Sequence, residues 1–213
     1  MPIEVRYCLL CDGSSDRLLR HPIRWILESL GVAERSFEWA DFRLEVTPPR
    51  ELHRRIALAR ERHNFDLLFV HRDAERDPHE SRVEEIQRAA LRAGLAGHVA
   101  VVPVRALESW LLHDEHAIRS AAANPSGSRP LGLPRLREIE HVSDPKARLR
   151  RALESALPDR PRDRARVAAR FPQMRSRVAE LSDYGALRQL PAFAAVCGSI
   201  ESWLSSAGAR QTS

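Results

Sequence analysis

The sequence of 213 residues has few cysteines, few aromatic residues and almost no lysine. Three cysteines are too few for a disulfide framework and are typical of a reducing compartment. Aromatic residues make up only 6%, so we expect a core of leucine, valine, isoleucine and alanine. No apolar run reaches the length of a membrane span, and the first residues lack the charged-then-apolar order of a signal peptide. We therefore expect a cytoplasmic protein with no membrane partner.

Several common binding motifs are also missing. Cys8 and Cys11 have C-x-x-C spacing, but no second pair of cysteines or histidines follows at the spacing of a zinc site. The sequence contains neither a P-loop nor the glycine pattern of dinucleotide-binding folds. These absences disfavour zinc-binding and nucleotide-binding proteins of those types.

The charge that is present is an excess of arginine. Lys and Arg total 34 against 29 Asp and Glu, a net charge of +5, and Lys146 is the only lysine. A preference for GC-rich codons explains the use of arginine. Phosphate recognition also accounts for it, because guanidinium groups match phosphate oxygens.

Short apolar runs alternate with helical patterns along the first half of the chain. We expect strands at 3–10, within 37–46 and there at 42–46, at 67–70 and at 99–104. We expect helices at about 15–30, 50–63, 80–93 and 107–113. This order predicts an α/β fold, with a parallel sheet flanked by helices, over residues 1–122. From residue 123 onward, we expect an arginine-rich helical appendage (123–213) that packs on the α/β domain. We expect it to be divided into short helices by Pro145, Pro158, Pro161, Pro172 and Pro191.

Acidic residues follow three of the expected strands. They are Asp12 and Asp16, then Asp73, Glu75 and Asp77, then Glu108 and Asp114. Ligands of parallel sheets bind at the carboxyl ends of the strands, where these residues can converge. Converging carboxylates repel one another unless a cation joins them, and Mg²⁺ accepts one or two carboxylates with phosphate oxygens and water. The pattern predicts a divalent metal site that polarises a phosphate and activates water.

Structural roles remain open for some of these residues. The charge of Asp16 would favour a helix N-terminus. Asp77 and Asp114 would each serve as a helix N-cap. Glu108 would form a hydrogen-bonded packing corner. His71 would be either a metal ligand or proton shuttle, or a structural histidine at the end of a strand.

Three segments in order resemble a known family. They are Asp12-Gly13-Ser14-Ser15-Asp16 after a strand, Asp73-Ala74-Glu75 after a later strand, and Glu108-Ser109-Trp110-Leu111-Leu112. The set resembles the Toprim domain shared by topoisomerases, primases and overcoming-lysogenization-defect family nucleases. It is most similar to small stand-alone bacterial Toprim-like proteins, and the resemblance covers about the first half of the chain.

The resemblance implies roles for the acidic residues. It makes Asp12 a general acid/base or metal-bridging residue, Asp73 and Glu75 ligands of Mg²⁺ or Mn²⁺, and Asp77 a further metal ligand. Asp16 and Glu108 would complete the catalytic set. Two positions depart from the family pattern: Asp12 stands where the family has Glu, and Glu75 where it has Asp.

Arginines provide candidate contacts to nucleic acid. We expect a DNA or RNA backbone to be held by Arg72, Arg76, Arg148, Arg151, Arg164 and Arg166. The C-terminal arginine clusters are also compatible with an ordinary solvated helix surface, which explains such clusters in most proteins, and with a docking surface for an acidic protein partner.

Three functions are compatible with these patterns. The resemblance implies a Mg²⁺-dependent nuclease that acts in bacterial phage defence beside an ATPase. Because the chain has no ATPase motif of its own, the ATPase would be a separate partner protein. The altered residues Asp12 and Glu75 support a catalytically degenerate Toprim-fold module for binding or assembly. A haloacid-dehalogenase-like phosphatase would use Asp73 as its nucleophile, although that family places its nucleophile after the first strand.

Overall fold

The computed structural model describes residues 3–43, 45, 47, 49–157 and 161–211, without the side chains of residues 161–166 and 207–211. Its strands are β1 (Ile3–Leu10), β2 (Val32–Ala40), β3 (Leu67–His71) and β4 (His98–Val101). Its α-helices are α1 (Arg20–Ser29), α2 (Leu52–Arg62), α3 (His79–Arg92), α4 (Glu115–Ala121), α5 (Pro145–Ala156), α6 (Pro161–Leu181) and α7 (Pro191–Gln211). Short 3₁₀ helices are η1 (Ser14–Leu19), η2 (Leu107–Leu111), η3 (Leu136–His141) and η4 (Tyr184–Gln189).

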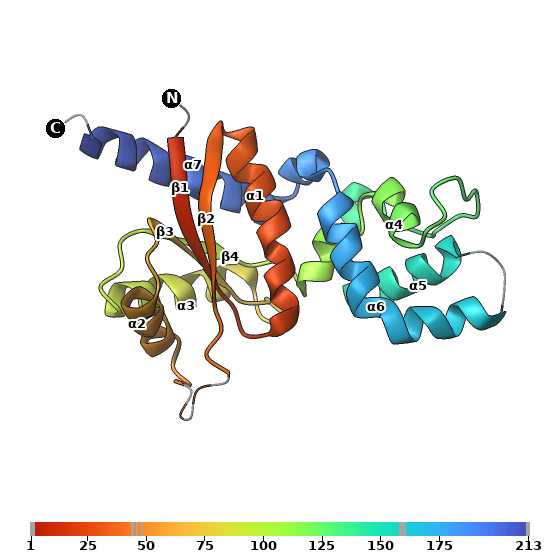
Figure 1. Cartoon of the computed structure of the whole chain (residues 1–213), viewed down its shortest axis with the longest axis horizontal. Coiled ribbons are helices and arrows are strands. Elements are labelled where there is room, and N and C mark those ends of the chain that lie inside the picture. Colours follow the sequence, from red (N-terminus) through yellow and green to blue (C-terminus); the bar gives the residue numbers. More distant parts are fainter. Residues whose placement is uncertain (1–2, 44, 46, 48, 158–160, 212–213) are drawn as a thin grey trace.

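The four strands form one parallel sheet in the order β2-β1-β3-β4 (Figure 1). The two central strands pair in register, with Leu10 opposite Val70. Helices connect the strands and flank the sheet, which confirms the expected α/β fold. Because β1 and β3 are neighbours, the loops that leave their carboxyl ends start side by side.

The central strands are buried on both faces, and alternate residues face different helices. Tyr7 and Leu9 of β1 belong to the same core cluster as residues of α1 and α7. Cys8 and Leu10 belong to a second cluster with residues of α2 and α3. The sheet is therefore the middle of three layers, with α1 and α7 against one face and α2 and α3 against the other.

The second strand is not where the sequence pattern placed it. The expectation of a strand at 42–46 is wrong: β2 spans Val32–Ala40, and the described residues between 41 and 51 include no strand. Gly31 adopts a left-handed conformation (φ 72°), so the chain turns directly from the end of α1 into β2. As an edge strand, β2 pairs only with β1 and keeps polar residues such as Glu34 and Arg35, which weakens its apolar signal.

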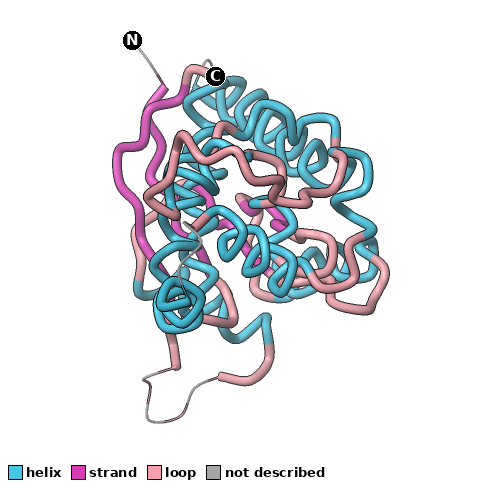
Figure 2. Tube along the Cα trace, turned by 90° about the vertical axis from the view of Figure 1, so that its right-hand side faces the viewer, coloured by secondary structure: helices cyan, strands magenta, loops and turns pink. Residues whose placement is uncertain are grey.

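The C-terminal half is helical, as expected, and divides into two parts (Figure 1). Helices α4, α5 and α6 gather at one end of the molecule, and in the perpendicular view of Figure 2 this end faces the viewer. Helix α7 instead returns to the sheet and contacts β4. The expectation that Pro172 separates two helices is wrong, because it lies inside α6. No helix in the described part of the chain has the length and apolar character needed to cross a membrane.

Candidate functional site

The candidate site lies at the carboxyl edge of the sheet, where β1 and β3 end. Residues 11–16 leave β1 and enter η1, and residues 72–78 leave β3 and enter α3. The all-parallel order brings both acidic motifs to this edge. Sequence order alone did not establish that the two strands are direct neighbours, but the pairing of β1 with β3 does.

Asp16 is locked into the turn after β1. One of its carboxylate oxygens accepts a hydrogen bond from the Gly13 amide (2.8 Å), and the other accepts one from the Ser15 hydroxyl (2.9 Å). A Cβ atom at position 13 would lie 3.1 Å from that first oxygen, so the close approach explains the glycine. Asp16 is buried, with 8% of its surface exposed. Its local contacts satisfy the carboxylate, as expected of an acid with a structural role near a helix N-terminus.

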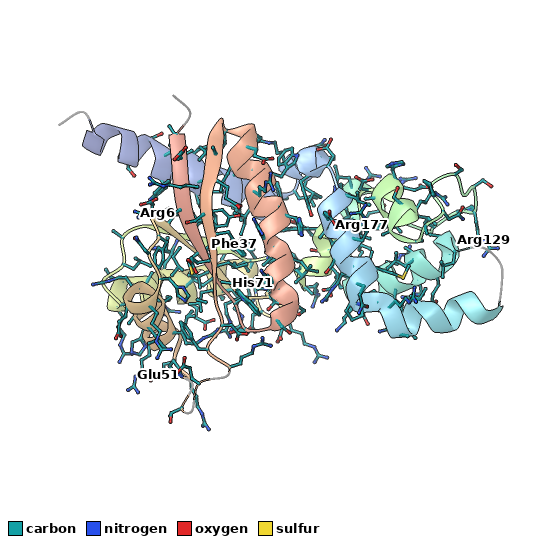
Figure 3. The ribbon with its side chains drawn as sticks, viewed as in Figure 1. Arg6, Phe37, Glu51, His71, Arg129 and Arg177 are labelled. Atoms are coloured by element: carbon teal, nitrogen blue, oxygen red, sulfur yellow. The ribbon has the colours of Figure 1, made fainter. Side chains whose placement is uncertain are left out.

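His71, the last residue of β3 (labelled in Figure 3), has two of the acids close to its ring. It is 2% exposed, and its Nδ1 donates to the Val101 carbonyl (2.9 Å), which turns Nε2 toward the carboxylates. Nε2 lies 3.4 Å from Asp73 and 3.9 Å from Asp16. Burial disfavours the charged ring, but the hydrogen bond and charge of Asp73 and the charge of Asp16 outweigh burial and raise the pKa of His71. The raised pKa favours positive charge on this ring, which lies between two acids from different strand ends.

Asp73 connects this cluster to the next loop. Its Oδ1 accepts a hydrogen bond from the Leu107 amide (3.0 Å), at the start of η2. The side chain is 32% exposed, so unlike Asp16 it is accessible to a ligand. Of the residues expected to hold a metal, Asp73 is the one that faces His71 directly.

Asp12 lies at the same edge but is neutralised by arginines. Its carboxylate pairs with Arg55 of α2 and with Nε of Arg72 (3.0 Å). Arg72 also pairs with Glu85 of α3 (3.1 Å), so it holds the loop after β3 against that helix. The Asp12 side chain remains 48% exposed. Arg55 was not identified from the sequence, because nothing in a helical arginine of α2 signals a partner 43 residues away.

The remaining acids of the second motif have other surroundings. Glu75 is exposed and left-handed (φ 54°), with its backbone amide bonded to the Arg105 carbonyl (3.0 Å) and its carbonyl to the Arg105 guanidinium (3.1 Å). Asp77 pairs with Arg82 (2.8 Å) rather than capping α3, whose N-cap is Pro78. Among the residues that the structure describes, neither carboxylate contacts His71, Asp16 or Asp73, which together form the His71 cluster.

Glu108 is part of the buried core rather than of an open site. It is 4% exposed and pairs with Arg175 of α6, itself 7% exposed. The sequence had left open a packing and hydrogen-bonding role for Glu108, and the geometry has that form. Its neighbour in the pattern, Asp114, caps α4 by accepting from the Ala117 amide (2.9 Å), as the capping interpretation predicted.

The arginines expected to bind nucleic acid fall in different places. Arg72 is committed to Asp12 and Glu85, whereas Arg76 is exposed at a hollow of about 360 Å³ that Lys146 also lines. Arg148 is partly buried and Arg151 exposed on α5. The expected contacts at Arg164 and Arg166 lie outside the described side chains.

The metal hypothesis needs ligands beyond the protein. Within the described part of the chain, no three His, Cys, Asp or Glu side chains are grouped so that they could hold a metal ion. Asp12 and Asp73 are accessible carboxylates that follow β1 and β3, and Mg²⁺ is commonly held by one or two carboxylates together with substrate phosphate oxygens and water. The donor set fits that arrangement and does not fit a closed, all-protein metal site.

The chain is therefore a parallel α/β protein whose sheet carries acidic residues and arginines at its carboxyl edge. Comparison of the chain with protein-family models, with curated proteins and with solved structures gives no match.

Proposed function

We propose that this protein is a Toprim-like phosphodiesterase that cleaves DNA or RNA with Mg²⁺ or Mn²⁺, in the cytoplasm, beside a partner ATPase. The supporting observation is that Asp16 and Asp73, from the ends of β1 and β3, both face Nε2 of His71. Acids from two separate sequence motifs therefore lie together at the carboxyl edge of the sheet, which supports a phosphate-processing metal site there.

The accessible acids have distinct roles in this proposal. Asp73 and Asp12 hold the metal ion, which polarises a phosphate oxygen and activates a water molecule. Asp16 is too buried to reach a substrate, and it positions His71 and the turn after β1. The expected catalytic role of Glu108 is replaced by a structural one, because its charge is used by Arg175.

A non-catalytic binding module is the second candidate, and the ion pairs of Asp12 favour it. Arg55 and Arg72 both neutralise this carboxylate, so a metal ion has to displace two guanidinium groups. The same arginines would bind a phosphate without any metal. The two candidates therefore differ in whether a divalent ion enters the edge.

Cleavage assays with an isosteric variant separate the candidates. Plasmid DNA and RNA are incubated with the protein in Mg²⁺, Mn²⁺ or EDTA, with and without the partner ATPase. Asp73→Asn keeps an oxygen that accepts from the Leu107 amide but removes the charge, and we expect cleavage to fall by about 100-fold or more. Glu75→Gln is the matched control from the same motif, and we expect less than about a tenfold loss, because Glu75 has no contact with the His71 cluster among the described residues.

Two outcomes would contradict these assignments. Equal losses in the two variants would contradict the assignment of the metal to Asp73 over Glu75. If titration calorimetry detects no Mg²⁺ binding, and no cleavage occurs even with the ATPase, the enzyme proposal fails and the binding module stands.

A further inference from the structure

A groove of about 610 Å³ is lined by residues of α1 and α6. Figure 1 shows where these two helices lie. Its walls come from η1 and α1 on one side and from α6 and η4 on the other. Ser14, which belongs to the turn after β1 together with Asp12 and Asp16, lines the groove. The groove therefore reaches the turn that carries Asp12 and Asp16, and its walls come from both the N-terminal and the C-terminal halves of the chain.

Most charged groups along the groove are already paired. Arg20 pairs with Glu34 (2.6 Å), Arg24 with Glu28 (2.7 Å), and the wall residue Glu180 with Arg177 (2.8 Å), which Figure 3 labels on α6. These pairs leave the walls nearly neutral.

Arg17 is different, because it is exposed and makes no ion pair with any residue that the structure describes. Its guanidinium carbon lies 5.5 Å from the centre of the Trp39 ring, and the Trp39 indole donates to Cys11 Sγ (3.2 Å) at the end of β1. The aromatic contact steadies the guanidinium while leaving its N–H donors available. An oriented cation thus stands in the wall of the groove, one residue after Asp16 in the chain.

The rest of the lining is neutral and suits a sugar-phosphate chain. Ser14 and Ser176 present exposed hydroxyl groups, and Leu18 and Trp25 provide apolar surface. Burial lowers the pKa of His21, so this ring is neutral at pH 7 and adds no second charge. The volume lies within the range of about 300–1,000 Å³ that is typical of small-ligand sites, which suits one or two nucleotides and is too small for a duplex.

We propose that this groove binds a single strand of nucleic acid, with Arg17 holding the backbone phosphate next to the one at the acidic edge. The inference rests on the proposed function and specifies its substrate as single-stranded. It also assigns the substrate path to the space between α1 and α6, rather than to the arginines of α5.

Binding in EDTA tests the groove without requiring cleavage. Fluorescence anisotropy measures the affinity for a labelled single-stranded oligonucleotide and for its duplex over a range of salt concentrations. We expect the single strand to bind more tightly than the duplex. In Arg17→Ala we expect about tenfold weaker single-strand binding and a salt slope that is shallower by about 0.7, the value of one lost phosphate contact on a single strand.

Two further variants give the comparison its controls. Arg88→Ala removes the same charge from an exposed position on α3, on the other face of the sheet, and should leave affinity within about twofold. Ser176→Trp places a large ring in the groove from an exposed position of α6, and should block single-strand binding with unchanged thermal stability.

The results distinguish this inference from the proposed function. If single-strand binding depends on Arg17 but no cleavage occurs with any metal, the groove proposal is supported and the nuclease proposal is rejected. If nucleic acid is cleaved but wild type, Arg17→Ala and Ser176→Trp bind the single strand with equal affinity, the groove proposal is rejected and the nuclease proposal is retained. Duplex binding as tight as single-strand binding, or equal losses in Arg17→Ala and Arg88→Ala, also overturns the groove.

Discussion

The acids at the ends of β1 and β3 and the acid after β4 follow the same sequence pattern but have opposite surroundings. Asp73 faces a buried histidine and keeps 32% of its side chain exposed. Glu108 is sealed in the core by Arg175, a residue 67 positions later in the chain. One acid is available to a ligand, whereas the other joins the C-terminal helices to the α/β layer.

This difference shows what decides the role of an acid at the end of a strand. Strand order determines which acids can meet, because β1 and β3 are neighbours in the sheet. Ion pairs with arginines then determine which carboxylates stay available to a ligand. Arg175 neutralises Glu108 in the core, whereas Arg55 and Arg72 neutralise Asp12 but leave it partly exposed. Removing these neutralising contacts one at a time should therefore change the role of each acid.

The largest effect is expected at the buried pair. Glu108→Ala leaves the Arg175 guanidinium buried without its partner, and Arg175 Nε already lacks a hydrogen-bond partner within the described structure. We expect the free energy of unfolding to fall by about 3–5 kcal/mol, as measured by urea denaturation. Glu75→Ala, an exposed acid, is the control and should change it by less than about 0.5 kcal/mol.

The double variant Glu108→Leu/Arg175→Met sharpens this test. It removes both charges at once and should recover much of the lost free energy of unfolding, because an apolar pair of similar size leaves no buried charge without a partner. A loss below about 1 kcal/mol in Glu108→Ala would contradict the structural role and restore Glu108 as a candidate catalytic residue.

The sequence predicted the fold more completely than it predicted the strand boundaries. Runs such as Leu67–Val70 are apolar throughout because both faces of β3 are covered, and this pattern identifies a central parallel strand. The edge strand β2 was misplaced, since only its two end residues, Val32 and Ala40, are buried and the residues between them give a weak apolar signal. Pro172 shows a second limit, because packing retains a proline within α6 where local propensity predicts a break.

The candidate site could be predicted only in part. The sequence shows that Asp12, Asp16 and Asp73 come shortly after predicted strands, which was enough to place them at the carboxyl edge of the sheet. The roles of Arg55 and Arg175 were not visible, because each depends on a contact with a residue more than 40 positions away. The left-handed backbone of Glu75, which carries it into the contact with Arg105, has no sequence signal in a non-glycine residue.

An intermediate effect is expected from freeing Asp12. Arg55→Ala removes one of the two guanidinium groups on this carboxylate, so a metal ion no longer competes with it. We expect Mg²⁺ affinity in titration calorimetry to rise about two- to fivefold, in keeping with an exposed ion pair worth up to about 1 kcal/mol. Arg54→Ala is the neighbouring control, because Arg54 pairs with Glu51 instead. An affinity that is the same in both variants would mean that Arg55 does not guard the metal position.

The smallest effect is expected at the opposite edge of the sheet, where an acid has no ligand role. The Arg6 guanidinium and amide hold Asp66 at the start of β3, and these hydrogen bonds lower the pKa of Asp66 below its usual range. Because the folded-state pKa is depressed, the stabilisation is present above the unfolded value of about 3.9 and is lost as pH falls through the lower folded value.

Asp66→Asn should therefore be less stable than wild type near pH 6, with a difference that shrinks as the pH falls below about 3.9 and through the lower folded-state pKa. Urea denaturation of both proteins over this pH range measures it. Mg²⁺ should leave the difference unchanged, since Asp66 lies at the amino edge of the sheet and Asp73 at the carboxyl edge. A difference that is constant with pH would show that packing, rather than the charge of Asp66, holds β1 against β3 at that edge.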